Sequence, residues 1–311
     1  MSWSKYDESY FLFSCIAMML ALAPLPWNFR SWNVGIPCIG VYTAMSCLIN
    51  IVNHIVWANN DYDSFPVWCD ITSKLLVGLP IGLSAAALCV ARRLYICLGP
   101  SRSPLKAQMR KAFHFDFFFA VGVPLFVTGP LYTLVRGWRY EIVFDRGCLP
   151  APHEDLGSHL LIHGWPVLLG TTALVYGGLA LRAFVTYDED IENIAAPNVP
   201  ALDRSHVIGL VGLATATAVL GMPPAVCRIF MDMSSGDVIR WIPWDYERIY
   251  QPVVLFTFTE TKELHAINGL FSWIPNIIGL VYFLSLSLVQ EDQPEHPPTP
   301  PTIEEKAMHQ A

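Results

Sequence analysis

The sequence VWCDITSKLLVGLPIGLSAAALCVARRLYICLG, residues 67–99, decides the fold because its apolar run is longer than a bilayer requires. A membrane-spanning helix needs about 20 residues, and a longer one tilts. The two ends of this stretch carry different chemistry. Cys69 and Asp70 lie near its start, whereas the cations Arg92 and Arg93 lie near its end. The stretch therefore predicts a membrane helix with one end suited to a disulfide and the other end cationic.

The composition of the whole chain agrees with a membrane protein. Hydrophobic residues make up 53% of its 311 residues and charged residues only 14%, whereas a soluble domain carries about 25% charged residues. The net charge of −7 argues against nucleic acid as a partner, because phosphate binding needs clustered cations. The cysteines form no CxxC pair and no spacing typical of a metal site, so we expect no metal and no cofactor.

Apolar runs separated by polar loops predict an all-α membrane protein that folds as a bundle of seven transmembrane helices. The predicted spans are Tyr10–Trp27, Val34–Trp57, Val67–Gly99, Phe113–Val135, Leu160–Phe184, Val207–Phe230 and Ala266–Val289. We expect residues 1–9 to form an extracellular N-terminus, residues 10–289 the transmembrane domain and residues 290–311 a disordered, Pro-rich cytoplasmic tail.

The distribution of Lys and Arg among the loops predicts the orientation in the membrane. The short loop between the third and fourth spans, with the flanking helix ends, carries six cations between residues 91 and 111. Short cationic loops stay on the cytoplasmic side. We therefore expect the N-terminus to lie outside and the protein to be a multi-pass protein of the plasma membrane.

A disulfide is expected at the outer end of the third span. With this orientation, Cys69 and Cys148 both lie on the oxidising side of the membrane, where disulfides persist. Their bond would hold the loop around Cys148 over the bundle. Two free thiols are the alternative, and Cys227 near the top of the sixth span is a rival partner.

Lys74 is a cation inside a span, where a charge is costly and normally faces the bundle interior or a partner. Asp70 lies one helical turn earlier and could pair with it. Lys74 could instead extend toward the interface, or it could line a ligand cavity.

Polar residues in the second span lie at helical spacing. Asn50, Asn53 and His54 share one face, and Asn276 follows Pro275 in the seventh span. Hydrogen bonds between helices explain such residues most simply, while a contact with a ligand is the alternative.

Aromatic and cationic residues on the outer side are candidates for binding a ligand. The outer loop around residues 240–250 has more aromatic residues than an interfacial belt needs, and such a surface suits an apolar ligand. Our candidate ligand-binding residues are Trp68, Lys74, Trp138, Arg139, Trp241, Trp244 and Tyr246.

Cations on the inner side are candidates for binding a G protein, although such charges can also merely mark the membrane edge. Our candidates are Arg92, Arg93, Arg110 and Arg204. The sequence has no HExxH, GxSxG or Walker motif, so we expect no catalytic residues and no enzyme. A transporter or channel is the alternative class, but we find neither an internal repeat nor charges in the middle of several spans.

Several segments resemble the fungal a-factor-type mating pheromone receptors of class D, seven-helix G-protein-coupled receptors, and most of all the basidiomycete branch. They are LPWNFRSWNVG at 25–35, INIVNHIVW at 49–57, FPVWCDITSKLLVGLPIGLSAAALCVARRLY at 65–95, Trp165-Pro166 and RWIPWDY at 240–246. The resemblance covers residues 10 to about 290.

This resemblance implies a receptor for a short peptide whose C-terminal cysteine is farnesylated and carboxymethylated. It also implies a heterotrimeric G protein α-subunit as the partner inside the cell. A prenyl chain gains about 0.8 kcal/mol for each buried CH₂ group, so we expect an apolar, aromatic-lined path for it. The charged outer loops would then meet the peptide and select between pheromone variants.

Overall fold

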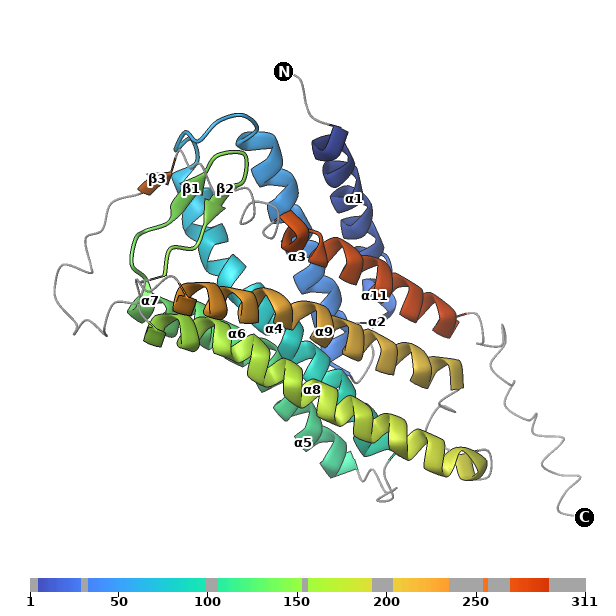
Figure 1. The fold of residues 1–311 in the computed structure, drawn as a ribbon. Helices are drawn as coiled ribbons and strands as arrows, with labels where there is room; N and C mark the ends of the chain where they lie inside the picture. Colours follow the sequence, from blue (N-terminus) through green and yellow to red (C-terminus); the bar gives the residue numbers. More distant parts are fainter. Residues whose placement is uncertain are drawn as a thin grey trace, which may run out of the picture.

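A computed structural model describes residues 5–28, 33–98, 106–152, 156–191, 204–234, 254–256 and 269–290. Seven helical segments within these ranges are long and apolar enough to cross a membrane, as the sequence predicts. They are Glu8–Asn28, Gly35–Val56, Pro66–Leu98, Ala112–Val135, Leu156–Thr186, Ser205–Phe230 and Gly269–Ser287. They form an elongated bundle with a small sheet at one end (Figure 1).

Helix α4 (Pro66–Leu98) lies at the centre of the bundle. It packs against α3 (Gly35–Val56), α8 (Leu156–Ile191) and α9 (Arg204–Ser234). In the most apolar window of α4, 78% of the residues are buried, against 22% in the first span. The third span is therefore the core of the fold, with α3, the fourth span, α8 and α9 arranged around it.

The first and last spans form the other side of the bundle. Helix α1 (Lys5–Leu22) and the short helix α2 (Leu25–Asn28) lie beside α3, and α11 (Ile274–Gln290) contacts α1, α3 and α9. Small residues allow close contact between helices. A Cβ atom added at Gly35 of α3 would lie only 2.6 Å from the backbone oxygen of Ala86 in α4, so this crossing tolerates no side chain.

The fourth span is irregular. It consists of α5 (Lys106–Phe117), the π-helical turn η1 (Phe118–Gly122), α6 (Val123–Phe126), the π-helical turn η2 (Val127–Leu131) and α7 (Tyr132–Val135). Pro124 has no N–H group to donate to the carbonyl of Ala120 four residues earlier. The hydroxyl of Tyr42 in α3 donates a hydrogen bond to that carbonyl instead. A neighbouring helix thus satisfies a backbone group that the proline leaves free.

A three-stranded sheet covers one end of the bundle (Figure 1). Strands β1 (Glu141–Val143) and β2 (Gly147–Leu149) form an antiparallel hairpin, and β3 (Val254–Phe256) pairs in parallel with β1. We call residues 136–152 the lid. The opposite end of α4, which carries Arg92 and Arg93, is called the arginine end. At a rise of about 1.5 Å per residue, Arg92 lies about 35 Å along α4 from Cys69.

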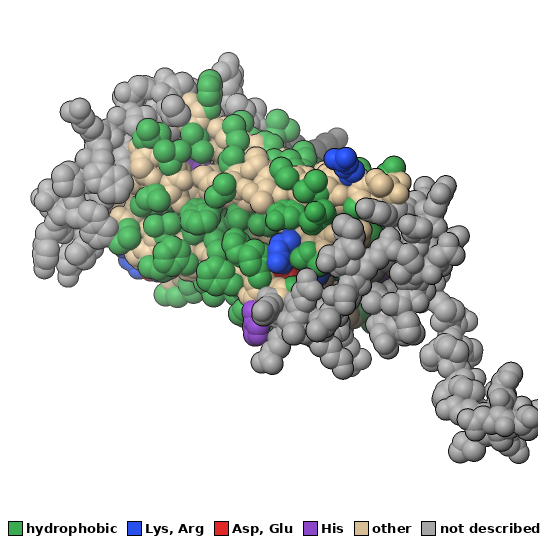
Figure 2. Space-filling view, turned by 90° about the horizontal axis from the view of Figure 1, so that it is seen from below, with side chains coloured by type: hydrophobic (Ala, Val, Ile, Leu, Met, Phe, Trp, Pro, Cys, Tyr) green, Lys and Arg blue, Asp and Glu red, His purple; other side chains and the backbone are tan. Residues whose placement is uncertain are grey.

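The outer surface of the bundle is apolar. Phe118 and Leu125 of the fourth span are 61% and 65% exposed, and Leu168 of α8 is 59% exposed. Hydrophobic side chains cover most of the described surface in Figure 2, with few charged ones among them. A soluble monomer rarely exposes so continuous an apolar surface, whereas the lipid-facing side of a membrane protein does.

Candidate functional site

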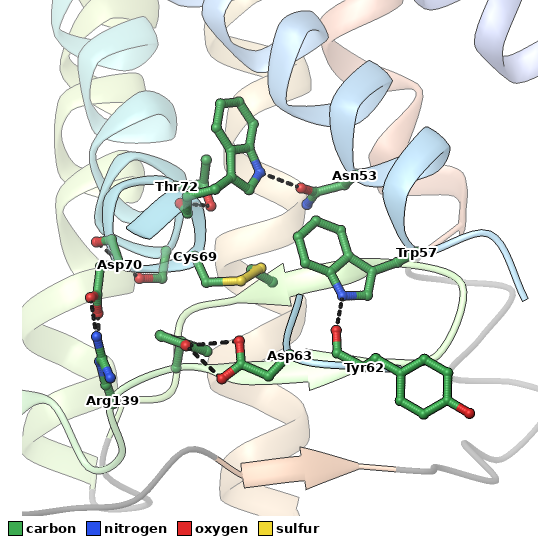
Figure 3. The surroundings of a disulfide bond; sticks show 12 residues. Asn53, Trp57, Tyr62, Asp63, Cys69, Asp70, Thr72 and Arg139 are labelled. Carbon is green, nitrogen blue, oxygen red and sulfur yellow. Dashed lines mark hydrogen bonds and ion pairs between the residues drawn. A yellow bond between two sulfur atoms is a disulfide. The ribbon is translucent and has the colours of Figure 1, made fainter. Parts of the chain in front are cut away.

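A disulfide fastens the lid to the central helix. Cys69 in the first turn of α4 is bonded to Cys148 of β2, with their Cα atoms 5.2 Å apart, and Cys227 is free (Figure 3). Both bonded cysteines are fully buried in a small cluster with Trp57, Tyr140 and Ile142. The lid therefore has a hydrophobic core of its own, to which the sequence-predicted disulfide belongs.

Two indole groups bind the lid end of α3 to its neighbours. The Nε1–H of Trp68 donates to Oδ1 of Asn53 at 3.0 Å, and the Nε1–H of Trp57 donates to the carbonyl oxygen of Tyr62 at 3.0 Å (Figure 3). Trp68, which we expected to bind ligand, thus joins α4 to α3. Asn53 takes part in a hydrogen bond between helices, as its position within a span predicts.

Gly147 allows the hairpin to lie against α3. Its φ angle is +78°, in the left-handed region that favours glycine. A Cβ atom at this position would lie 2.7 Å from the ring of Trp57 and 3.0 Å from the side chain of Asn53. Both the backbone conformation and the close contact therefore require glycine at the start of β2.

Two carboxylates hold the lid from outside its core. Asp70 accepts a hydrogen bond from Nε of Arg139 at 2.9 Å and forms an ion pair with the same guanidinium, and this bonding raises the pKa of Arg139 (Figure 3). Asp63 accepts from the hydroxyl of Tyr140 at 3.1 Å. Burial first, and then this hydrogen bond, raises the pKa of Tyr140 to about 12. Asp70 therefore forms its ion pair with Arg139 of the lid, and Lys74 acts on Asp70 only as a neighbouring charge.

A cavity of about 650 Å³ lies beneath the lid, within the size range of small-molecule and cofactor sites. Helices α4, α8 and α9 supply lining residues that are mostly apolar, which we call the apolar wall: Leu76, Val77, Leu79, Pro80, Leu83, Ile162, Pro166, Gly221, Pro224 and Ala225. Helix α3 and the lid supply most of the polar lining residues, which we call the polar wall: Ser46, Asn50, Asn53, His54, Glu141, Asp145 and Arg146.

Other residues complete the lining. Val143, Leu149, Pro150 and Pro152 of the lid and Phe271, Ile274 and Pro275 of the seventh span add apolar surface. His163 of α8 and Arg228 of α9 interrupt the apolar side, and Tyr10 of α1 closes the cavity beside the seventh span. The ring of Tyr10 meets that of His54 edge-on, with the two centroids 6.1 Å apart. The cavity can therefore hold a ligand with one hydrocarbon side and one polar side.

The cavity includes only part of what the sequence predicts. The polar stripe Asn50, Asn53 and His54 lines it, but Trp68, Lys74, Trp138 and Arg139 are not among its lining residues. Trp138 is 41% exposed on the lid. Trp241, Trp244 and Tyr246 lie outside the described residues. The apolar wall was missed because nothing in an apolar span distinguishes a cavity-lining leucine from a core or lipid-facing one.

Asn276 belongs to a buried polar network rather than to the cavity. Its Nδ2 donates to Oγ of Ser14 at 3.1 Å, and the thiol of Cys47 donates to its Oδ1 at 3.6 Å. The network links α1, α3 and α11. The structure therefore supports the simpler explanation of Asn276, a hydrogen bond between helices.

At the arginine end, two cations of α4 hold one carboxylate of the fourth span. Asp116, whose side chain is fully buried, accepts from Arg93 at Oδ2 and from Arg92 at Oδ1, the latter at 3.2 Å. The guanidinium of Arg92 also lies 4.0 Å from the ring centroid of Phe115. Asp116 was not among the predicted site residues, although a single acid within the apolar run FHFDFFF was a signal.

For the other two candidate G-protein-binding residues, Arg110 and Arg204, the structure describes only the backbone. Arg110 lies in α5, and Arg204 is the first residue of α9. Their side chains lie outside the described part of the structure. Of the four predicted cations, the structure therefore brings together Arg92 and Arg93.

Seven apolar spans, a disulfide-bonded lid and a cavity beneath it define a helical membrane protein with a ligand-sized chamber at one end. Residues 9–293 match the family model described as pheromone A receptor, and the chain belongs to this family. The protein is thus a multi-pass protein of the plasma membrane, as predicted.

The chain is similar to pheromone receptors from three fungi. The pheromone B alpha 3 receptor of Schizophyllum commune is 30% identical over 92% of this chain and 46% of its own length. Pheromone receptor 1 of Mycosarcoma maydis is 26% identical over 75% of this chain and 65% of its own length. The pheromone a factor receptor of Saccharomyces cerevisiae is 26% identical over 61% of this chain and 41% of its own length. The chain thus spans less than half the length of the Schizophyllum relative.

Proposed function

We propose that this chain is a receptor for a farnesylated peptide mating pheromone that signals through the α-subunit of a heterotrimeric G protein. Membership of the pheromone A receptor family supports the receptor class. The single observation that carries the choice of ligand is the cavity under the lid, because it offers a hydrocarbon wall and a polar wall side by side. A lipidated peptide has the same two kinds of surface.

The prenyl group lies against the apolar wall. Burial of a hydrocarbon chain contributes about 0.8 kcal/mol for each CH₂ group, so the chain supplies most of the affinity. The peptide meets the polar wall, where Glu141, Asp145 and Arg146 of the lid provide both signs of charge. Charged contacts of this kind discriminate between peptides because an unmatched charge is left without a partner.

The lid end faces the outside of the cell and the arginine end faces the cytosol. The Cys69–Cys148 bond supports this orientation, since disulfides persist on the oxidising side of a membrane. The cations of the loop after α4 support it as well. The N-terminus then lies outside, the ligand binds from outside, and the G protein binds at the arginine end.

The direct test is a signalling assay in yeast cells that lack their own pheromone receptor. A G-protein-driven reporter is read against synthetic peptides, each made with and without the farnesyl group. A response to one farnesylated peptide that disappears without the lipid is the expected result. The lack of any response, with the protein shown at the cell surface, would refute the proposed function.

Two matched variants test whether the cavity is the binding site. Leu76→Phe fills part of the cavity, while Leu75→Phe makes the same change at the adjacent position of α4, which does not line it. We expect Leu76→Phe to reduce pheromone potency at least about tenfold, corresponding to about 1.4 kcal/mol, and Leu75→Phe to change it little. Equal effects of the two variants would place the ligand elsewhere.

A further inference from the structure

The fourth span carries a buried charge that the ligand cavity does not use. The side chain of Asp116 is 0% exposed, and it lies at the arginine end, far from the cavity. A charge in a membrane span is costly and normally has a function. Ion pairs buried in this way contribute little net stability compared with well-packed apolar residues, so stability alone does not explain this one.

The two arginines hold Asp116 unequally. Arg93 is buried and donates both Nε and Nη2 to the same oxygen, Oδ2, at 3.0 and 2.5 Å. Arg92 is more exposed, at 21% of its side chain, and gives one contact to Oδ1 at 3.2 Å. Arg92 can therefore leave the carboxylate while Arg93 still neutralises it. Such an arrangement makes an open state accessible without leaving the buried carboxylate unpaired.

The backbone changes from α-helical to π-helical geometry next to Asp116. Helix α5 ends one residue after Asp116, and the π-helical turn η1 follows at once. Single π-helical turns inside α-helices are rare and often occur at functional sites. Two hydrogen bonds cross this joint: the thiol of Cys89 donates to the carbonyl of Asp116 at 3.4 Å, and Tyr42 donates to that of Ala120. Apolar contacts accompany them, because Phe119 of η1 packs against the core and stacks on Phe115.

We propose that Arg92, Arg93 and Asp116 form a latch that keeps the arginine ends of the third and fourth spans together in the resting receptor. Opening begins when Arg92 leaves Asp116, and η1 then allows the start of the fourth span to move. The released guanidinium turns to carboxylate or carbonyl oxygens of the cytoplasmic partner. A partner that binds only the open state shifts the population toward it. The latch rests on the proposed receptor function, but it predicts activity without any ligand.

The test uses variants that open the latch without leaving a buried charge. In Asp116→Asn with Arg93→Gln, both the anion and its buried partner become neutral, so the fold is retained. Arg92→Gln removes only the more exposed of the two ion pairs with Asp116. Asp70→Asn is the matched control, because it breaks an aspartate–arginine pair at the opposite end and does not line the cavity. Reporter output without pheromone is measured in the yeast strain and divided by the amount of receptor at the cell surface.

The double variant is expected to raise ligand-independent output about tenfold, Arg92→Gln to raise it less, and Asp70→Asn to leave it at the wild-type value. Suppose that the receptor responds to peptide and that the double variant reaches the cell surface. If the ligand-independent output of the double variant then equals that of the wild type, the latch is overturned, while the receptor function stands.

A receptor that responds to no peptide overturns the proposed function instead, and the latch is then judged from purified protein. Spin labels on Cys97 of α4 and on Phe113→Cys of α5 report the separation of the two helix ends, in a background that keeps the buried Cys89 and lacks the other free cysteines. If the labels lie farther apart in the double variant than in the labelled protein without the two latch substitutions, the latch is supported. Identical distance distributions overturn it.

Discussion

The protein has an aspartate–arginine contact at each end, and the two differ in burial. At the lid end, the Asp70 and Arg139 side chains are 32% and 43% exposed. At the arginine end, Asp116 is fully buried, and Arg93 and Arg92 are 9% and 21% exposed. Water screens the first pair, so it contributes little to stability. Water screens the second much less, so losing one partner leaves an uncompensated buried charge. The same two residue types thus serve as a surface contact at one end and as an internal joint at the other.

The largest expected effect is that of Asp116→Ala, which leaves two guanidinium groups without their carboxylate. Breaking a buried pair from one side costs about 3–5 kcal/mol. Thermal unfolding of purified protein in detergent should therefore show a large loss of stability. The comparison between the two ends fails if Asp116→Ala is no less stable than Asp70→Ala.

The next effect in size is that of removing the disulfide. The bond closes a long loop, since its cysteines are 79 residues apart, and removing such a bond typically costs about 2–4 kcal/mol. Cys69→Ser and Cys148→Ser should reduce surface expression and ligand response to the same extent, because each removes the same bond. A double Ser variant should be no worse than either single one, and markedly unequal single variants would contradict the pairing.

Gly147→Ala should have an intermediate effect confined to the lid. The new Cβ meets Trp57, and the positive φ angle disfavours any side chain, so we expect a loss of about 1–2 kcal/mol. Pheromone potency should fall while ligand-independent output stays at the wild-type value. Ala at Gly164, where a Cβ meets nothing within 4 Å, is the matched control. An equal loss in both variants would show that the hairpin contact is unimportant.

Asp70→Asn should have the smallest effect. Exposed ion pairs contribute about 0–1 kcal/mol, and salt weakens them further. The melting temperature should hardly change, and the remaining difference from the wild type should shrink as the salt concentration rises. A large loss that persists at high salt would mean that the lid depends on this pair as strongly as the arginine end depends on Asp116.

The spans and the disulfide could be predicted because each depends on a local signal. Apolar runs of membrane length identify the helices, and the predicted topology places Cys69, Cys148 and the rival Cys227 toward the same side. The structure decides between them, because Cys69 is bonded to Cys148 and Cys227 is free. The partner of Asp70 could not be predicted in this way. Lys74 is its neighbour on the helix, but Arg139 comes from the lid, and only the folded hairpin brings it close.

The cavity and the arginine-end cluster depend on how the helices pack. Leu76 lines the cavity and Leu75 does not, although both are adjacent leucines in the same apolar run. Asp116 was identifiable as an unusual acid, but its contact with Arg92 and Arg93 depends on how the irregular fourth span packs against α4. Pro124 and Pro130 indicate an irregular span, but they do not specify where its π-helical turns lie or which residues of α4 they meet.

The central claim is that the cavity beneath the lid binds the lipid of a peptide pheromone. The most direct measurement uses a farnesylated peptide with a photoreactive diazirine on its prenyl chain, followed by mass spectrometry of the labelled receptor. Labels on apolar-wall residues such as Leu79, Leu83 and Pro166, suppressed by excess unlabelled pheromone, are the predicted result. Labels confined to lipid-facing residues such as Phe118 and Leu168, unaffected by competition, would contradict it.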